Sequence, residues 1–346
     1  MIDKVSYSQL QKLTLQLFNK VGLPKEKAQI TSQVLLEGEL LGHRTHGLQL
    51  LMPYIEHLRN GSMEKEGAFK VLNQTPSSQL WDGKYLAGPW LVQSALKMAT
   101  QMSDEFGVGT IAIQKSSHIG CLAAYMEEST KNGHLIIMSC SDPDNTTVAP
   151  FGGTEGVYSP NPLALGIPTT SEPIIVDVSM SATSNGLIHQ KQQLKEPLEH
   201  PWLITADGQP TTDPETFFKK EPSTILPLGG MDSGYKGFAL GIMIEAMTSA
   251  LGGYGRSSEP GRWGASVFVQ VINPKRFSGE NYFKTEMDYL KKRCLASNPA
   301  NKEDTVRLPG QRGLEQKKKQ LLEGITLRPD TNLGLIKLAK EFEISL

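Results

Sequence analysis

The segment VGTIAIQKSSHIGCLAAYMEESTKNGHLIIMSC, residues 108–140, decides the fold class. It holds two short apolar runs rich in β-branched residues, 108–115 and 134–140, which flank a predicted helix. Runs of this length and composition predict buried strands. Similar runs occur at 172–179 and 265–272. Strands that alternate with helices in this way favour an α/β sheet.

The N-terminal part of the chain predicts helices instead. Apolar residues recur at helical spacing over 8–19 and about 25–41, and further helices are expected at 48–59 and 85–106. Pro89 stands near the start of the last of these, where the first turn of a helix accepts proline.

Composition narrows the range of functions. The chain has 346 residues, which is enough for about two domains. A formal net charge of -1 provides no basic field to attract phosphates, so neither a nucleic-acid nor an anionic-membrane partner is expected. No apolar stretch resembles a signal peptide or a bilayer span, and the three cysteines share no close spacing. We therefore expect a cytoplasmic protein with reduced thiols.

An apolar stretch at 35–58 is interrupted by GHRTHG, residues 42–47. The two glycines free the backbone, so the side chains between them can be aimed. His43 and His46 could cap the helix, ligate a metal or act as an acid/base. The stretch lacks the further ligands of a usual zinc site, so no metal is predicted. A structural and a catalytic role both stay open from this stretch alone.

A second histidine has a similar setting. His118 stands just after a predicted strand and just before a helix, where α/β folds usually build sites. A long glycine- and proline-rich segment follows at 142–173, and a loop of that length usually lines a site. Lys236 is predicted to open an apolar helix, and Arg312 lies in a second turn-to-helix element. Helix N-termini favour phosphates and carboxylates, although a surface or capping role stays open for both cations.

Several common signatures are absent. The sequence has no P-loop, no serine nucleophile elbow, no HExxH motif and no CxxC pair. The G-x-G at 107–109 precedes a predicted strand and does not follow one, so the Rossmann dinucleotide fingerprint is missing too.

Taken together, the motifs resemble those of the malate/L-lactate dehydrogenase family, which lacks a Rossmann fold. The resemblance runs along nearly the whole chain in the family's order. It rests on THG (45–47), SHIG (117–120), the long segment 141–168 with its PFGG and NPLA, VDVSMS (176–181), TADGQPTTDP (205–214), GYKGFALGIMIEAM (234–247) and LPGQR (308–312).

The resemblance implies an oxidoreductase acting on CH–OH groups, with NAD or NADP as cofactor and a small 2-oxo or 2-hydroxy acid as substrate. His118 is then the acid/base that exchanges a proton with the substrate oxygen, and imidazole has the pKa such a role requires. His46 is the second acid/base or an orienting donor, and Thr45 hydrogen-bonds in the same pocket. The implied cofactor contacts are Ser141, Asp177, Val178, Ser179, Ser181, Lys236, Gly310, Gln311 and Arg312.

The resemblance also implies an architecture. We expect a non-Rossmann, sulfolactate-dehydrogenase-like α/β fold with a mixed sheet and a helical segment from both chain ends. A helical substrate domain, 1–115 with 285–346, would pack beside an NAD(P)-binding domain at 116–284. Because the family's site lies between subunits, a homodimer is implied.

Two departures from the family pattern bear on the substrate and cofactor. The family usually has an arginine that grips the substrate carboxylate where this chain has Leu50, and Asn185 replaces a larger or charged residue. The substrate, the direction of reaction and the choice between NAD and NADP therefore stay open. The alternatives are a cyclic-imine reductase and a catalytically silent relative that only binds nucleotide.

Overall fold

The structure of the protein is a computed structural model that describes residues 4–301 and 305–345. Its centre is a mixed sheet in the order β1-β2-β3-β10-β4-β5-β6. Among these described strands only β2 and β3 are parallel neighbours. The strands are β1 (Lys70–Gln74), β2 (Ser78–Asp82), β3 (Val108–Ser116), β4 (Leu135–Ser141), β5 (Leu163–Ile167), β6 (Ile174–Val178) and β10 (Ala265–Ile272). The predicted α/β fold with a mixed sheet is confirmed.

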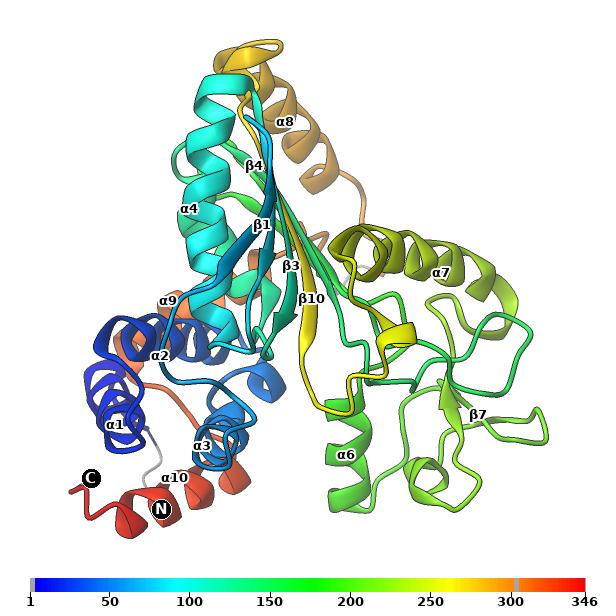
Figure 1. The fold of residues 1–346 in the computed structure, drawn as a ribbon. Coiled ribbons are helices and arrows are strands. Elements are labelled where there is room, and N and C mark those ends of the chain that lie inside the picture. The colour runs from blue at the N-terminus through cyan, green and yellow to red at the C-terminus, as the bar shows by residue number, and fades with distance from the viewer. Residues whose placement is uncertain (1–3, 302–304, 346) are drawn as a thin grey trace.

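A helical cluster is built from both ends of the chain, as Figure 1 shows at the lower left. Its core is apolar and includes the buried Phe18, Leu36, Tyr54, Leu58 and Leu335. The cluster consists of α1 (Tyr7–Lys20), α2 (Lys25–Leu40), α3 (Leu51–Arg59) and α10 (Pro329–Glu341). The predicted helical segment from both chain ends is therefore confirmed.

Close helix packing covers the sheet. α4 (Gly88–Phe106) lies on one face, where a Cβ at Gly109 of β3 would meet the Ala99 carbonyl oxygen at 2.0 Å. Only glycine permits that approach. The remaining helices are α5 (Met126–Thr130), α6 (Asn185–Leu194), α7 (Gly230–Glu245), α8 (Glu280–Leu295) and α9 (Gln311–Glu323).

A small second sheet follows β6 in the chain and has its own core of Val148, Tyr158, Ile188 and Leu203. Its order is β8-β7-β9, with β7 (Leu203–Ile204), β8 (Pro210–Thr211) and β9 (Thr224–Ile225).

The expected segments differ from the structure in specific places. The predicted loop at 142–173 contains β5, which pairs with both β4 and β6. Position 166 in this strand requires a glycine, because a Cβ there would lie 2.5 Å from the Thr130 side chain of α5. The division between 1–115 and 116–284 stays a prediction, and strands from both sides of it join one sheet. Within the described residues, no helix has the length and apolarity of a membrane span.

Candidate active site

The turn that carries His46 is fixed by a buried carboxyl group. After α2 the chain turns at Gly42 (φ +87°) and enters a single 3₁₀ turn that ends at His46. A Cβ at Gly47 would lie 2.6 Å from Oε2 of Glu39, so glycine is required there. The Leu48 amide donates to the same oxygen at 3.0 Å. Burial raises the pKa of Glu39 to about 7.

His118 is held by two groups at Nδ1. The residue follows β3, and the Gly120 amide donates to Nδ1 at 3.2 Å. The hydroxyl of Tyr54, buried on α3, lies 2.9 Å from Nδ1 and donates to the His118 carbonyl oxygen at 2.9 Å. These contacts leave Nε2 as the ring nitrogen available to a ligand.

Three rings stand in a row at the site. The His118 ring stacks on Trp263 at a centroid distance of 4.5 Å. The centroid of the His46 ring lies 5.8 Å from that of His118, and these two rings are also stacked. Trp263 comes from the loop before β10. Burial lowers the pKa of His118 to about 3 and that of His46 to about 4, so both imidazoles are neutral at pH 7. Thr45 Oγ1 lies 3.0 Å from His46 Nδ1 and fixes that ring.

These rings face a cavity of about 340 Å³. Among the predicted site residues, the cavity is lined by Thr45, His46, His118, Ser141, Asp177 and Ser179. The structure thus brings together all three residues predicted to be catalytic with three of those predicted to contact the cofactor.

A second cavity of about 370 Å³ adjoins the first, since His43 and Asp177 line both. Gly310 and Arg312 lie in its wall. Gly310 precedes α9 in a left-handed conformation (φ +81°), and a Cβ there would lie 2.7 Å from Ile175 Cβ. The predicted turn-to-helix element is therefore confirmed, with Arg312 in the first turn of α9.

The other predicted cofactor contacts lie outside both cavities. Val178 is exposed, and Ser181 is buried and donates to the Thr183 carbonyl oxygen at 2.7 Å. Gln311 accepts a hydrogen bond from the Leu308 amide. Lys236 is exposed on α7. The prediction that it opens its helix was wrong, because α7 begins at Gly230 and Lys236 lies in its second turn.

Two residues of the site were missed in the sequence. Tyr54 was assigned only to an apolar helix, and Trp263 was assigned to no helix or strand and to no role. A signal for Tyr54 existed, because a tyrosine hydroxyl needs a polar partner when its ring is buried. Nothing local to Trp263 marks its approach to His118, which depends on the path of the chain into β10.

Leu50 is half-buried and packs against the helical cluster, and it is not part of either cavity wall. The wall of the first cavity, as far as the described residues form it, holds no lysine or arginine but two carboxyl groups, Asp142 and Asp177. The nearby Arg256 is paired with Glu245 at 2.5 Å and donates to backbone carbonyl oxygens.

Comparisons with known proteins agree over almost the whole chain. A sequence model for the malate/L-lactate dehydrogenase family matches residues 5–335. The chain is 28% identical to a malate/(S)-sulfolactate dehydrogenase of Methanothermus fervidus over 350 residues, covering 99% of both chains. It is similar to the structure of a sulfolactate dehydrogenase from Methanocaldococcus jannaschii, with a TM-score of 0.87 and 26% identity, covering 99% of this chain and 98% of that one. A malate dehydrogenase of Entamoeba histolytica shares the fold, with a TM-score of 0.93 and 23% identity over 99% of each chain.

Proposed function

The chain belongs to the malate/L-lactate dehydrogenase family, and from that premise we propose that it is an NAD(P)-dependent oxidoreductase interconverting a small 2-oxo acid and its 2-hydroxy acid. The observation that carries this proposal is the pair of imidazoles, His46 and His118, in the wall of a cavity that adjoins a second one. When bound, the nicotinamide supplies or accepts the hydride, so the protein has to position the substrate and move a proton.

His118 is proposed as the group that moves this proton. In reduction, Nε2 donates a proton to the substrate oxygen and Nδ1 keeps the second one. The Tyr54 oxygen accepts a hydrogen bond from Nδ1–H, and the Tyr54 hydroxyl donates a hydrogen bond to the His118 carbonyl oxygen. The proposed productive neutral form therefore carries its proton on Nδ1 and gives up the hydrogen bond from the Gly120 amide to that nitrogen. Tyr54 is proposed as the positioning residue that selects this form.

The pKa of His118 favours the neutral ring in the free protein. That form suits the oxidation direction, in which Nε2 accepts the hydroxyl proton. In the reduction direction the carboxylate of a 2-oxo acid would stand close to the two imidazoles and favour their protonation, because an opposite charge nearby raises the pKa of histidine. His46, fixed by Thr45, is proposed to hold the substrate from the other side.

The second cavity is proposed to take the phosphates of the dinucleotide. Its residues fit such a group, because Arg312, Gly310 and Gly313 line the cavity at the N-terminus of α9, where a helix favours phosphate. Asp177, shared by both cavities, is proposed as a further contact. The contacts predicted for Val178, Ser179, Ser181, Lys236 and Gln311 stay predictions, as does the choice between NAD and NADP.

A homodimer is also proposed. α7 leaves large apolar side chains exposed, and a second copy of the chain would cover them. They are Met231, Tyr235, Leu240, Ile242 and Met243. Lys236 is exposed on the same helix. A cytoplasmic location stays a prediction.

A cyclic-imine reductase is the second candidate. The observation that favours it is the lining of the first cavity, with two carboxyl groups and, within the described residues, no lysine or arginine. Such a wall suits a substrate that becomes cationic on protonation.

The experiment is an absorbance assay of NADH and NADPH oxidation by the purified protein, with anionic, apolar and sugar-type 2-oxo acids and one cyclic imine. Turnover of a 2-oxo acid is the expected result, and preferential turnover of the imine would select the second candidate. A rise in melting temperature with cofactor but no turnover would indicate a silent nucleotide-binding relative. The absence of both turnover and cofactor binding would overturn the proposal.

A further inference from the structure

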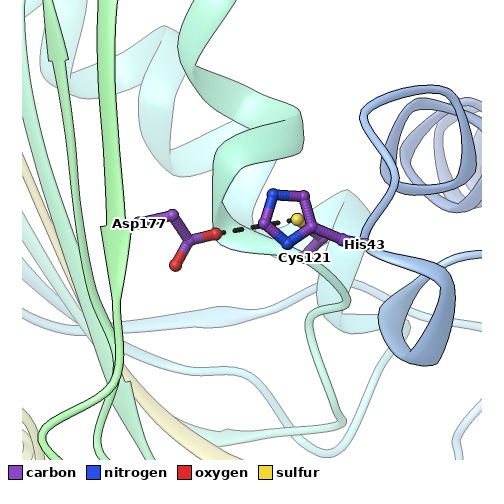
Figure 2. Close-up of side chains that lie close together, drawn as sticks. All are labelled: His43, Cys121 and Asp177. Atoms are coloured by element: carbon purple, nitrogen blue, oxygen red, sulfur yellow. Dashed lines mark hydrogen bonds between the residues drawn. The ribbon is translucent and has the colours of Figure 1, made fainter. Parts of the chain in front are cut away.

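His43, Cys121 and Asp177 meet at the boundary of the two cavities. Figure 2 shows their side chains converging, with His43 from the turn after α2, Cys121 from the segment after β3 and Asp177 from β6. One ring nitrogen, the thiol sulfur and one carboxylate oxygen all lie within 4.8 Å of one another. Three segments far apart in sequence thus present one nitrogen, one sulfur and one oxygen donor to a common point.

This donor set is one that zinc prefers. A tetrahedral zinc ion with bonds of about 2.0–2.3 Å holds its ligand atoms roughly 3.3–3.6 Å apart. Cys121 Sγ already lies 3.7 Å from Asp177 Oδ2. Closing the remaining separations requires side-chain shifts on the order of 1 Å. A thiolate with an imidazole selects zinc or cobalt over magnesium and calcium, which prefer oxygen ligands.

A purely structural role explains only part of the cluster. Oδ2 of Asp177 accepts from the Ala123 amide at 2.8 Å and from the Cys121 thiol, which fixes the turn after β3. That account leaves out His43. Its ring makes no hydrogen bond within the described part of the chain, although it lies beside a carboxylate and a thiol and is exposed to the cavities.

We propose that His43, Cys121 and Asp177 form a site for one divalent zinc ion, with its fourth position open to the cavities. On binding, the S–H bond of Cys121 breaks, a sulfur–zinc bond forms and the proton leaves to solvent. The thiolate and the carboxylate together balance the charge of the ion. Both cavities give the ion access, because His43 and Asp177 line each of them.

The site has a consequence that rests on the proposed function. If a dinucleotide contacts Asp177, the ion and the cofactor compete for the same carboxylate. Zinc is then an inhibitor that bound cofactor excludes.

The experiment titrates cobalt(II) into the reduced, untagged full-length protein without cofactor. The expected result is one bound ion with a near-ultraviolet thiolate-to-cobalt charge-transfer band, which zinc abolishes and magnesium leaves unchanged. Cys121→Ser should remove the band. Cys140→Ser and Cys294→Ser are the matched controls and should keep it, since Cys140 lines the same cavity outside the cluster.

Two further variants test the other ligands. His43→Gln and Asp177→Asn should each weaken cobalt binding by more than about tenfold, because even a residue that only supports a metal ligand is worth roughly 10–100-fold. Metal-free melting temperatures identify any variant that fails to fold, and His43→Gln, an exposed position, then carries the test.

The outcomes separate the two proposals. Absence of the band at one equivalent, or a band that survives in Cys121→Ser, overturns the zinc site. A cobalt band together with a failure of NADH and NADPH to bind would leave the zinc site standing and overturn the proposed function. Cofactor that binds without weakening cobalt binding would contradict the competition at Asp177.

Discussion

The Tyr54 hydroxyl lies 2.9 Å from Nδ1 of His118 and donates to the carbonyl oxygen of the same residue. Its oxygen can therefore accept a proton held on Nδ1, whereas the Gly120 amide can only donate to that nitrogen. One hydroxyl thus favours the tautomer that leaves Nε2 free to accept a proton, and the neighbouring amide favours the opposite tautomer.

Tyr54→Phe should lower kcat by roughly 10–100-fold, which corresponds to losing one hydrogen bond to a charged ring. Without Tyr54, the Gly120 amide would select the tautomer with its proton on Nε2. The pH at which kcat is half-maximal should also shift down, since the protonated ring of His118 loses an acceptor. Steady-state kinetics across pH measures both effects.

Tyr158→Phe is the matched control, because the Tyr158 hydroxyl is buried and has no hydrogen-bond partner within the described residues. Its kcat and pH profile should equal those of the parent. Equal profiles for Tyr54→Phe and the parent would show that Tyr54 does not position His118.

The free energy of unfolding of Glu39→Gln, relative to that of the parent, should increase as pH rises. The pKa of Glu39 is raised from 4.5 to about 7, so its contribution is most favourable below pH 4.5 and is lost as pH rises through 7. Between pH 5 and pH 8 the variant should gain up to about 3 kcal/mol on the parent. Denaturant unfolding at each pH measures the difference, and Glu155→Gln, at an exposed position, should show none.

Glu39→Ala tests the second role of the same side chain. It leaves the Leu48 amide buried without its acceptor, which costs about 1–3 kcal/mol, and it releases the turn that carries His46. We therefore expect kcat to fall in Glu39→Ala and to be kept in Glu39→Gln, whose amide oxygen can still accept. Equal kcat of the two variants would show that the hydrogen bond accepted by Glu39 does not support the position of His46.

His118→Asn should reduce the acid sensitivity of the fold. The folded pKa of His118 is about 3, below its unfolded value of 6.5, so between these values the unfolded chain binds a proton that the folded chain does not. Stability is then lost as pH falls, by about 1.4 kcal/mol per pH unit. Between pH 7 and pH 5, the unfolding free energy of the variant should therefore rise by about 2 kcal/mol relative to that of the parent.

The parent-minus-variant difference is the quantity to follow, because Glu39 and Asp142, whose pKa values are raised, oppose the histidines over the same range. His200→Asn, at an exposed position, should leave the pH dependence of the parent unchanged. A pH dependence of His118→Asn that matches the parent would mean that folding does not lower the pKa of His118.

Much of the fold could be predicted because its signals are local. The helices over 8–19 and 25–41 and the strands at 108–115 and 265–272 follow from apolar spacing, and the structure confirms them. β1 was missed because all its side chains are exposed and most are polar. β5 was missed because its segment contains prolines and Gly166, which predict a loop. The strand is stabilised by its pairing with β4 on one side and β6 on the other.

The site divides in the same way. His118 could be found because it stands at a recognisable junction between a strand and a helix, whereas Gly310 was implied only by the family resemblance. Trp263 and the approach of Cys121 to Asp177 could not, because these contacts arise between segments far apart in sequence. Lys236 was misplaced because its flanking glycines resemble a helix start, whereas both lie inside α7.

Substrate charge gives the last prediction. A 2-oxo acid with an uncharged side chain should have a kcat/KM at least about tenfold above that of a 2-oxo acid of similar size with a second carboxylate. The reason is that Asp142 and Asp177 stand in the cavity wall, where the described residues offer no lysine or arginine. An unpaired buried charge costs several kcal/mol, and about 1.4 kcal/mol corresponds to a factor of ten in affinity. Asp142→Asn should narrow the ratio by improving KM more for the dicarboxylate than for the monocarboxylate, and Asp207→Asn, at an exposed position, should leave the ratio unchanged. A preference for the dicarboxylate would contradict this prediction and would require a cation from outside this cavity wall.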